Sequence, residues 1–123
     1  MSASSIEWIL VVSGIITAIG GLGAFLSPGL LLRSGFGVGS PDASALFLAR
    51  HWGVLIFVIG ALIVHVAYAD AVRAPILIAA AVEKFAIGAL VFFGPLQRTA
   101  AMTAIAVVDG IFALFYVAYL AGL

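Results

Sequence analysis

Four long apolar runs, separated by short polar segments, occupy most of the 123-residue chain. Each run is about 20 residues long, the length that an α-helix needs to cross a bilayer core of about 30 Å. The pattern predicts an all-α, polytopic membrane protein, a four-transmembrane-helix bundle in one membrane domain over residues 1–123. The expected spans cover about 6–26, 45–69, 75–94 and 99–120, with an interfacial loop at 28–44.

The composition agrees with this pattern and narrows the partners. Hydrophobic residues make up 66% of the chain and charged residues 8%, and the mean hydropathy is +1.37. These values are typical of an integral membrane protein whose main partner is the lipid bilayer. Scattered basic residues and a net charge of zero provide no nucleic-acid site. The chain has no cysteine, which excludes disulfides, iron–sulfur clusters and cysteine nucleophiles.

The arginines predict an orientation in the membrane. Arg33, Arg50 and Arg98 fall on one side of the predicted spans, and Arg73 lies alone on the other. Positively charged loops tend to remain in the cytoplasm. Both termini of this multi-pass protein are therefore expected outside the cytoplasm, and the expected location is the cell (plasma) membrane.

Small residues recur every three or four positions along the first predicted span. They are Ser13, Gly14, Thr17, Ala18, Gly20, Gly21 and Gly23. Small residues let helix backbones approach closely in lipid, so a tight helix interface is expected, and a glycine-lined substrate passage is the alternative. Because four short helices form a thin bundle, we also expect a homo-oligomer or a partner membrane subunit.

Charged residues interrupt the third and fourth spans at Glu83, Lys84 and Asp109. Such groups at membrane depth cost about 2.5 kcal/mol or more and are functional candidates by default. At about 1.5 Å per residue, they lie with Thr17 and His65 about 6 to 18 Å from the interface that the termini share. The spans are therefore expected to build one polar pocket in that half of the membrane.

The polar and aromatic residues of the spans divide into two candidate sets. The candidate catalytic residues are Glu83, Asp109, His65 and Lys84. The candidate ligand-binding residues are Thr17, Ser13, His51, Trp52, Arg50 and Tyr116. Arg50 and His51 are expected near the opposite face of the membrane. No metal site is expected, because no close-spaced pair of ligands is present.

Two carboxyl groups and one ammonium group leave an excess negative charge among Glu83, Lys84 and Asp109. Either a carboxyl group is protonated, His65 is protonated, or a cationic ligand or proton completes the balance. Such a carboxyl group suits acid–base chemistry or a proton relay. The structural alternative is an ion pair between Lys84 and either carboxylate that only holds the third and fourth spans together.

His51 and His65 suggest a different function. They lie fourteen residues apart in the second predicted span, about 40° short of four full helical turns and about 21 Å apart along the axis. One helix could thus reach two haems on opposite sides of the bilayer. Each haem would need a second axial ligand. The sequence has no other histidine, so this alternative requires a homodimeric cytochrome, and the residues otherwise assign no cofactor.

Several residues also resemble a known pattern. The first span ends at Pro28, Arg50-x-Trp52-Gly53 opens the second, Lys84 or Glu83 charges the third, and Asp109-Gly110 lies in the fourth. This layout resembles small four-helix membrane proteins of the DoxX-like kind over the whole chain. Some members are similar to membrane subunits that accompany quinone-linked oxidoreductases, so the resemblance implies a link to quinone chemistry. It carries over no catalytic residue.

Two classes of function are expected from these residues. In the first, the pocket binds a lipophilic small molecule, such as a quinone, terpenoid or sterol-like compound, and Glu83, Asp109 and His65 exchange protons with it. The protein would then be a membrane-embedded isomerase or cyclase, or an oxidoreductase subunit. In the second, the chain is a proton- or cation-coupled transporter or an accessory subunit, and Lys84 is the counter-charge.

Overall fold

The computed structural model describes residues 1–123 and contains helices and no strands. The helices are α1 (Ala3–Leu26), α2 (Pro28–Leu30), α3 (Ala43–Val66), α4 (Arg73–Phe93) and α5 (Ala100–Leu120). A π-helical turn, η1 (Leu31–Gly35), follows α2, and a 3₁₀ turn, η2 (Asp70–Val72), precedes α4. The four long helices are long and apolar enough to cross a membrane. The predicted all-α, four-span membrane protein is confirmed.

The helix ends differ by a few residues from the predicted ones. The second span was expected to reach 69, but α3 ends at Val66, and α4 begins at Arg73 rather than 75. Pro75 lies in the first turn of α4, where its missing N–H has no helical partner to lose. The predicted loop at 28–44 contains α2 and η1 before it becomes irregular. Apolar runs mark helices well, but capping contacts decide where they end.

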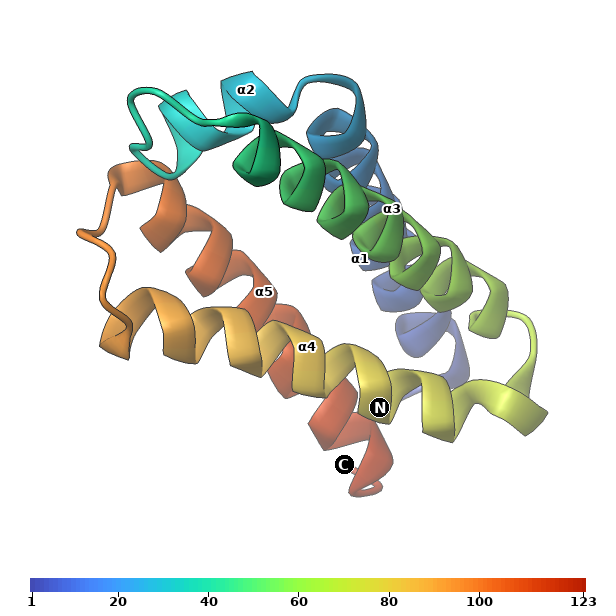
Figure 1. The fold of residues 1–123 in the computed structure, drawn as a ribbon. Coiled ribbons are helices and arrows are strands. Elements are labelled where there is room, and N and C mark those ends of the chain that lie inside the picture. The colour runs from blue at the N-terminus through green and yellow to red at the C-terminus, as the bar shows by residue number, and fades with distance from the viewer.

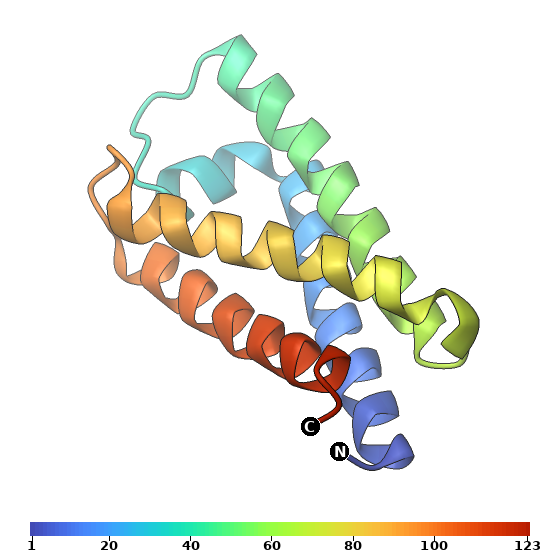
Figure 2. The ribbon, with the colours of Figure 1, turned by 90° about the horizontal axis from the view of Figure 1, so that it is seen from below.

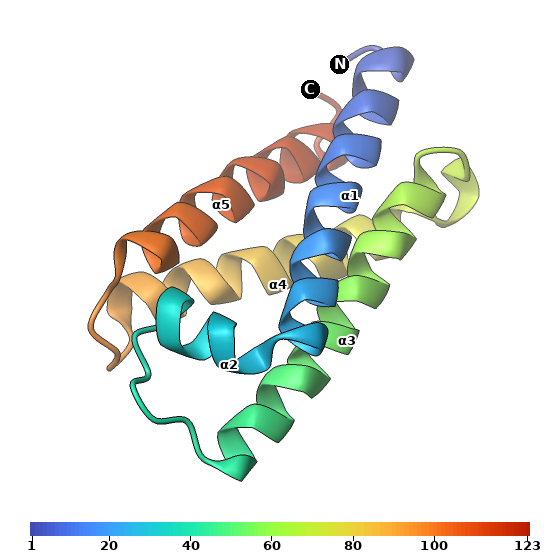
Figure 3. The same ribbon diagram turned by 90° about the horizontal axis from the view of Figure 1, so that it is seen from above.

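The long helices form two pairs. Most contacts between helices join α1 to α3 and α4 to α5, and few join one pair to the other. Figure 1 shows α3 and α4 converging at the short connection between them and diverging towards α2. The termini lie close together, as Figures 2 and 3 show from opposite sides, and the Met1 ammonium donates to the Leu123 carbonyl at 2.6 Å.

Glycines bring α1 and α3 into backbone contact. A Cβ added to Gly21 would lie 2.6 Å from the carbonyl oxygen of Gly53, and one added to Gly60 would lie 2.6 Å from that of Gly14. Neither carbonyl can move without moving its helix. The small residues of α1 thus form the expected tight interface, and its partner is α3 of the same chain. By contrast, an added Cβ would meet nothing within 4 Å at Gly20 or Gly23.

The largest buried apolar cluster lies at the end of the bundle that holds the termini. All four long helices contribute to it, with side chains that include Leu10, Ile63, Leu77 and Tyr116. A smaller cluster of Val91, Met102 and Ala106 joins α4 to α5 towards the opposite end. The two pairs are therefore packed tightly against each other at one end only, and their polar residues lie further along.

Arg73 ties the start of α4 to the end of α3. Its Nε donates to the Val66 carbonyl at 2.7 Å and its Nη2 to the Ala67 carbonyl at 2.9 Å. Its Nη1 donates to the Tyr119 hydroxyl at 3.1 Å, and Nη2 lies 2.6 Å from the Asp70 carboxylate. Because the last carbonyls of a helix have no partner within it, this guanidinium satisfies them and joins α3, α4 and α5.

Candidate functional site

A buried ammonium group connects three helices at mid-bundle. Lys84 of α4 donates from Nζ to Oδ1 of Asp109 on α5 at 3.0 Å and to Oγ1 of Thr17 on α1 at 2.9 Å. The Lys84 side chain is 0% exposed and that of Asp109 is 21% exposed. The Phe112 ring lies 5.8 Å from Nζ. The positive charge is therefore matched by one carboxylate and one hydroxyl in surroundings that admit little water.

Glu83 is adjacent to Lys84 in sequence but takes no part in this ion pair. Neighbouring residues of a helix point about 100° apart, so the two side chains leave α4 in different directions. Glu83 Oε2 is buried and has no hydrogen-bond partner. An unpartnered carboxyl oxygen in an apolar region costs free energy, which is why such atoms call for a functional explanation.

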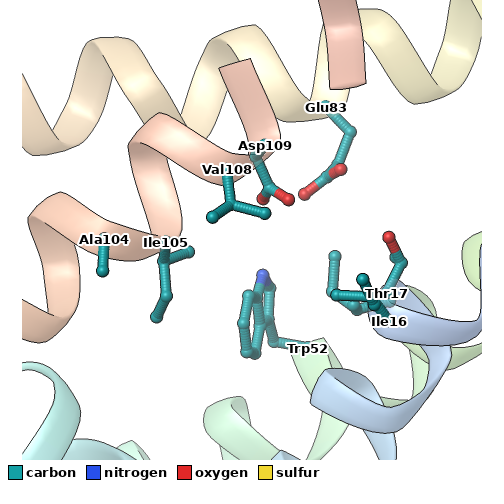
Figure 4. Close-up of a pocket in the computed structure, with 9 residues that line it drawn as sticks. Ile16, Thr17, Trp52, Glu83, Ala104, Ile105, Val108 and Asp109 are labelled. Carbon is teal, nitrogen blue, oxygen red and sulfur yellow. The ribbon is translucent and has the colours of Figure 1, made fainter. Parts of the chain in front are cut away.

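Both carboxyl groups line a pocket of about 300 Å³ between the two helix pairs. Figure 4 shows Glu83 and Asp109 directed into it, with Trp52 approaching them from the opposite wall. All four long helices contribute to the lining, which consists of Ile16, Thr17, Trp52, Ile56, Glu83, Ala104, Ile105, Val108 and Asp109. The pocket thus combines apolar walls with a few convergent polar groups, the usual make-up of a small-molecule site.

Trp52 also lines a second pocket of about 350 Å³ whose walls are entirely hydrophobic. This apolar pocket lies between η1, the start of α3 and the C-terminal part of α4, and its lining includes Leu32, Phe36, Ala49 and Ile87. The Phe36 ring packs edge-on against Trp52, at 90° and with 6.5 Å between ring centroids. The indole therefore lines both the polar pocket and the apolar pocket.

The structure brings together four residues that depth along the helices had grouped, namely Thr17, Glu83, Lys84 and Asp109. It places His65 apart from them, because this side chain is exposed near the end of α3 and absent from the pocket lining. His65 follows Ile56 by nine positions, which is two and a half helical turns, so the two side chains point to opposite sides of α3. The expectation that His65 shares the pocket overlooked this angle.

The other candidate residues are scattered. Ser13 and Tyr116 are buried and share a hydrogen bond between α1 and α5, outside the pocket lining. Arg50 and His51 are exposed near the start of α3, and the Arg50 guanidinium lies 6.0 Å from the Phe25 ring centroid. No three His, Asp or Glu side chains are grouped so that they could hold a metal ion.

Sequence reasoning missed two residues that line pockets, Ile56 and Glu7. Trp52 was predicted to bind ligand, and it lines the polar pocket together with Ile56, one turn further along α3. The spacing of Trp52 and Ile56 on the same side of a helix was a usable signal. Glu7 lines a pocket near the termini with Trp8, Val11 and Tyr68.

Comparisons of the chain with protein-family models, with curated proteins and with solved structures find no match. The geometry of the pocket is therefore the basis for a functional proposal. In fold, the chain is a multi-pass integral membrane protein built from four apolar helices.

Proposed function

We propose that this membrane protein binds a lipophilic small molecule in the pocket between its two helix pairs and exchanges a proton with it. The observation that carries the proposal is Glu83 Oε2, a buried oxygen without a hydrogen-bond partner on the wall of an otherwise mainly apolar pocket. A ligand hydroxyl or N–H group would supply the missing donor. Quinols, terpenoid alcohols and sterol-like compounds have both the apolar body and the donor.

The neighbouring charged residues support Glu83 as the group that exchanges the proton. Lys84 is engaged by Asp109 and Thr17, so its charge is already balanced. Glu83 remains as the group that accepts or donates a proton, and Asp109 is held in place by Lys84 at the same pocket. His65 lies outside the pocket, so the proton-transfer role falls to Glu83. Isomerisation, cyclisation or a quinone-linked step could use a carboxyl group in this position.

Transport is the second candidate function, and the excess carboxyl group favours it. Two carboxyl groups and one ammonium group share the pocket region, so a proton or a cation can bind there without exceeding neutrality. The same site could then carry a proton or cation between the two sides of the membrane. A DoxX-like relationship, a location in the plasma membrane with both termini outside, and a homo-oligomer or partner subunit belong to the proposal in either form.

Glu83→Gln is expected to abolish retention of a lipophilic compound by the purified protein. The glutamine amide cannot exchange a proton, and its neutral oxygen accepts a weaker hydrogen bond from a ligand donor than a carboxylate does. Organic extracts of gently purified wild-type and variant protein, compared by mass spectrometry, measure this directly. Glu7→Gln is the matched control, since it removes the same charge at a separate pocket. A compound retained equally by wild type and a folded Glu83→Gln variant would contradict the proposal.

The same samples separate the remaining alternatives. In the homodimeric cytochrome, the haems bound by His51 and by His65 would lie outside this pocket, because both side chains are exposed on α3. They would give a Soret band that Glu83→Gln leaves intact. If the protein is a transporter, Glu83→Gln removes the pH dependence of flux in reconstituted vesicles. If the pocket performs chemistry on a bound compound, no such flux is expected.

A further inference from the structure

Resting on the proposed ligand site, we infer that its ligand carries one positive charge: a protonated amine on an apolar body, whose N–H groups can donate to Glu83. The cationic group binds between Glu83 and Trp52, and the apolar body extends past Trp52 into the apolar pocket. This narrows the ligand class from lipophilic molecules in general to lipophilic cations. Charge balance, aromatic contact and the Trp52 wall that the two pockets share carry the inference.

Charge balance is the first step. The charged groups around the polar pocket are Glu83 and Lys84 from α4 and Asp109 from α5. The sides of the pocket formed by α1 and α3 supply Thr17, Trp52 and isoleucines, none of which is charged. With Lys84 paired to Asp109, one carboxyl group has no counter-charge. A monovalent cation completes neutrality, whereas a neutral ligand requires a proton in addition.

The aromatic wall is the second step. Trp52 lies across the pocket from Glu83 and Asp109, with its indole nitrogen directed towards them (Figure 4). An indole is the best of the aromatic side chains at attracting an ammonium group, and the attraction strengthens where water is excluded. An alkylammonium group that lies over the indole face and donates to the Glu83 carboxylate would use both walls of the pocket. An alcohol would bind the carboxylate alone, and a quinone, which has no donor, would bind only to the protonated carboxyl group.

The apolar pocket is the third step. It begins at Trp52, holds about 350 Å³ and has ten hydrophobic lining residues. An apolar group attached to the cation can therefore leave the polar pocket beside Trp52 without meeting another polar side chain. The two pockets together fit an amphiphilic cation with a single chain, placed with its charge at mid-bundle and its chain towards η1.

Binding of decylammonium and decanol to the full chain in phosphatidylcholine nanodiscs tests the inference, with empty nanodiscs as the baseline. The two probes share a ten-carbon chain and differ in charge. Wild-type protein should bind the cation saturably, and about tenfold or more tightly than the alcohol, because a desolvated ion pair is made with Glu83. Binding of the cation should weaken as the pH falls, since protons compete for the same carboxylate.

Variants separate the contributions. Glu83→Gln should weaken binding of the cation about tenfold or more and binding of decanol by a smaller factor, because the alcohol loses a hydrogen bond but no ion pair, whereas Glu7→Gln should change neither. Trp52→Leu should weaken the cation about threefold or more, and Trp52→Phe should retain part of the effect because it keeps an aromatic ring. Circular dichroism verifies that each variant is folded.

Different results would overturn the positive charge of the ligand and the ligand site itself. Saturable binding of both probes with equal affinity would overturn the positive charge and leave the lipophilic ligand site standing. Equal binding of the cation by wild type and folded Glu83→Gln would also overturn it. Absence of saturable binding of either probe to folded wild-type protein would overturn the ligand site itself.

Discussion

Lys84→Met is expected to destabilise the protein by about 3 kcal/mol, because it leaves Asp109 without its counter-charge beside a second carboxyl group, Glu83. The estimate lies at the lower end of the range for broken buried ion pairs, since the Asp109 side chain is 21% exposed. Thr17 also loses the ammonium group that binds its hydroxyl. Thermal unfolding in detergent, followed by circular dichroism, measures the loss.

Asp109→Asn is the matched comparison, and we expect it to destabilise the protein less than Lys84→Met does. In that variant Lys84 still binds Thr17, and Glu83 is close enough along α4 to supply a compensating negative charge. The double variant Lys84→Met/Asp109→Asn should recover much of the stability lost in Lys84→Met. Equal losses from both single variants, with no recovery in the double variant, would show that the ion pair does not hold the helices as described.

Gly21→Ala and Gly20→Ala should have opposite outcomes although the glycines are adjacent. The new Cβ at position 21 would lie 2.6 Å from the Gly53 carbonyl oxygen and close to the backbone of Phe57, so α1 and α3 must separate. Overpacking of this kind costs about 1–3 kcal/mol. At position 20 nothing lies within 4 Å, so alanine should be neutral or slightly stabilising through its higher helix propensity.

Thermal unfolding in detergent, followed by circular dichroism, measures the stability of both glycine variants. Gly60→Ala should behave as Gly21→Ala does, because its Cβ would meet backbone atoms of Gly14 and Ala18. Gly110→Ala in α5 is a further control without neighbours within 4 Å. If Gly21→Ala and Gly20→Ala were equally stable, close backbone contact would not be what joins α1 to α3.

The contact within one helix pair differs in kind from the contact between the pairs, and the pocket lies between the pairs. α1 and α3 meet through glycines, so their contact is short-range and fixed in register. α1 meets α4 and α5 through Lys84, Thr17 and Asp109. Polar contacts between helices in lipid are worth about 0.6 kcal/mol on average, less than is often assumed. At mid-bundle, beyond the apolar cluster near the termini, the contact between the pairs is therefore weaker than the contact between α1 and α3, and the pocket lies there.

The spans could be predicted from sequence because each helix requires an apolar run of nearly the same length. The depth of a residue follows from its number along the helix, so Thr17, Lys84 and Asp109 could be grouped before the structure was known. The packing role of Gly14 and Gly21 was expected, but their partner in α3 was not. Both predictions depend on position along one helix alone.

Rotation and pairing of the helices could not be predicted in the same way. His65 has a suitable depth but points half a turn away from the pocket side of α3. Arg73 was treated as part of a turn, whereas its guanidinium is buried against the carbonyls of Val66 and Ala67. Such contacts depend on which helices are neighbours, and lipid-facing and pocket-facing sides are both apolar here. Hydropathy therefore does not distinguish them.

Photolabelling tests the position of the ligand site most directly. The probes are a ten-carbon alcohol and the amine of the same chain, each with a diazirine beside its polar group, added to the protein in nanodiscs and mapped by peptide mass spectrometry. We expect labelling to concentrate on pocket residues of α3 and α5, such as Ile56, Ile105 and Val108, and to fall in Glu83→Gln. Labelling spread evenly over the lipid-facing helix surfaces, and unchanged in Glu83→Gln, would contradict a ligand site between the helix pairs.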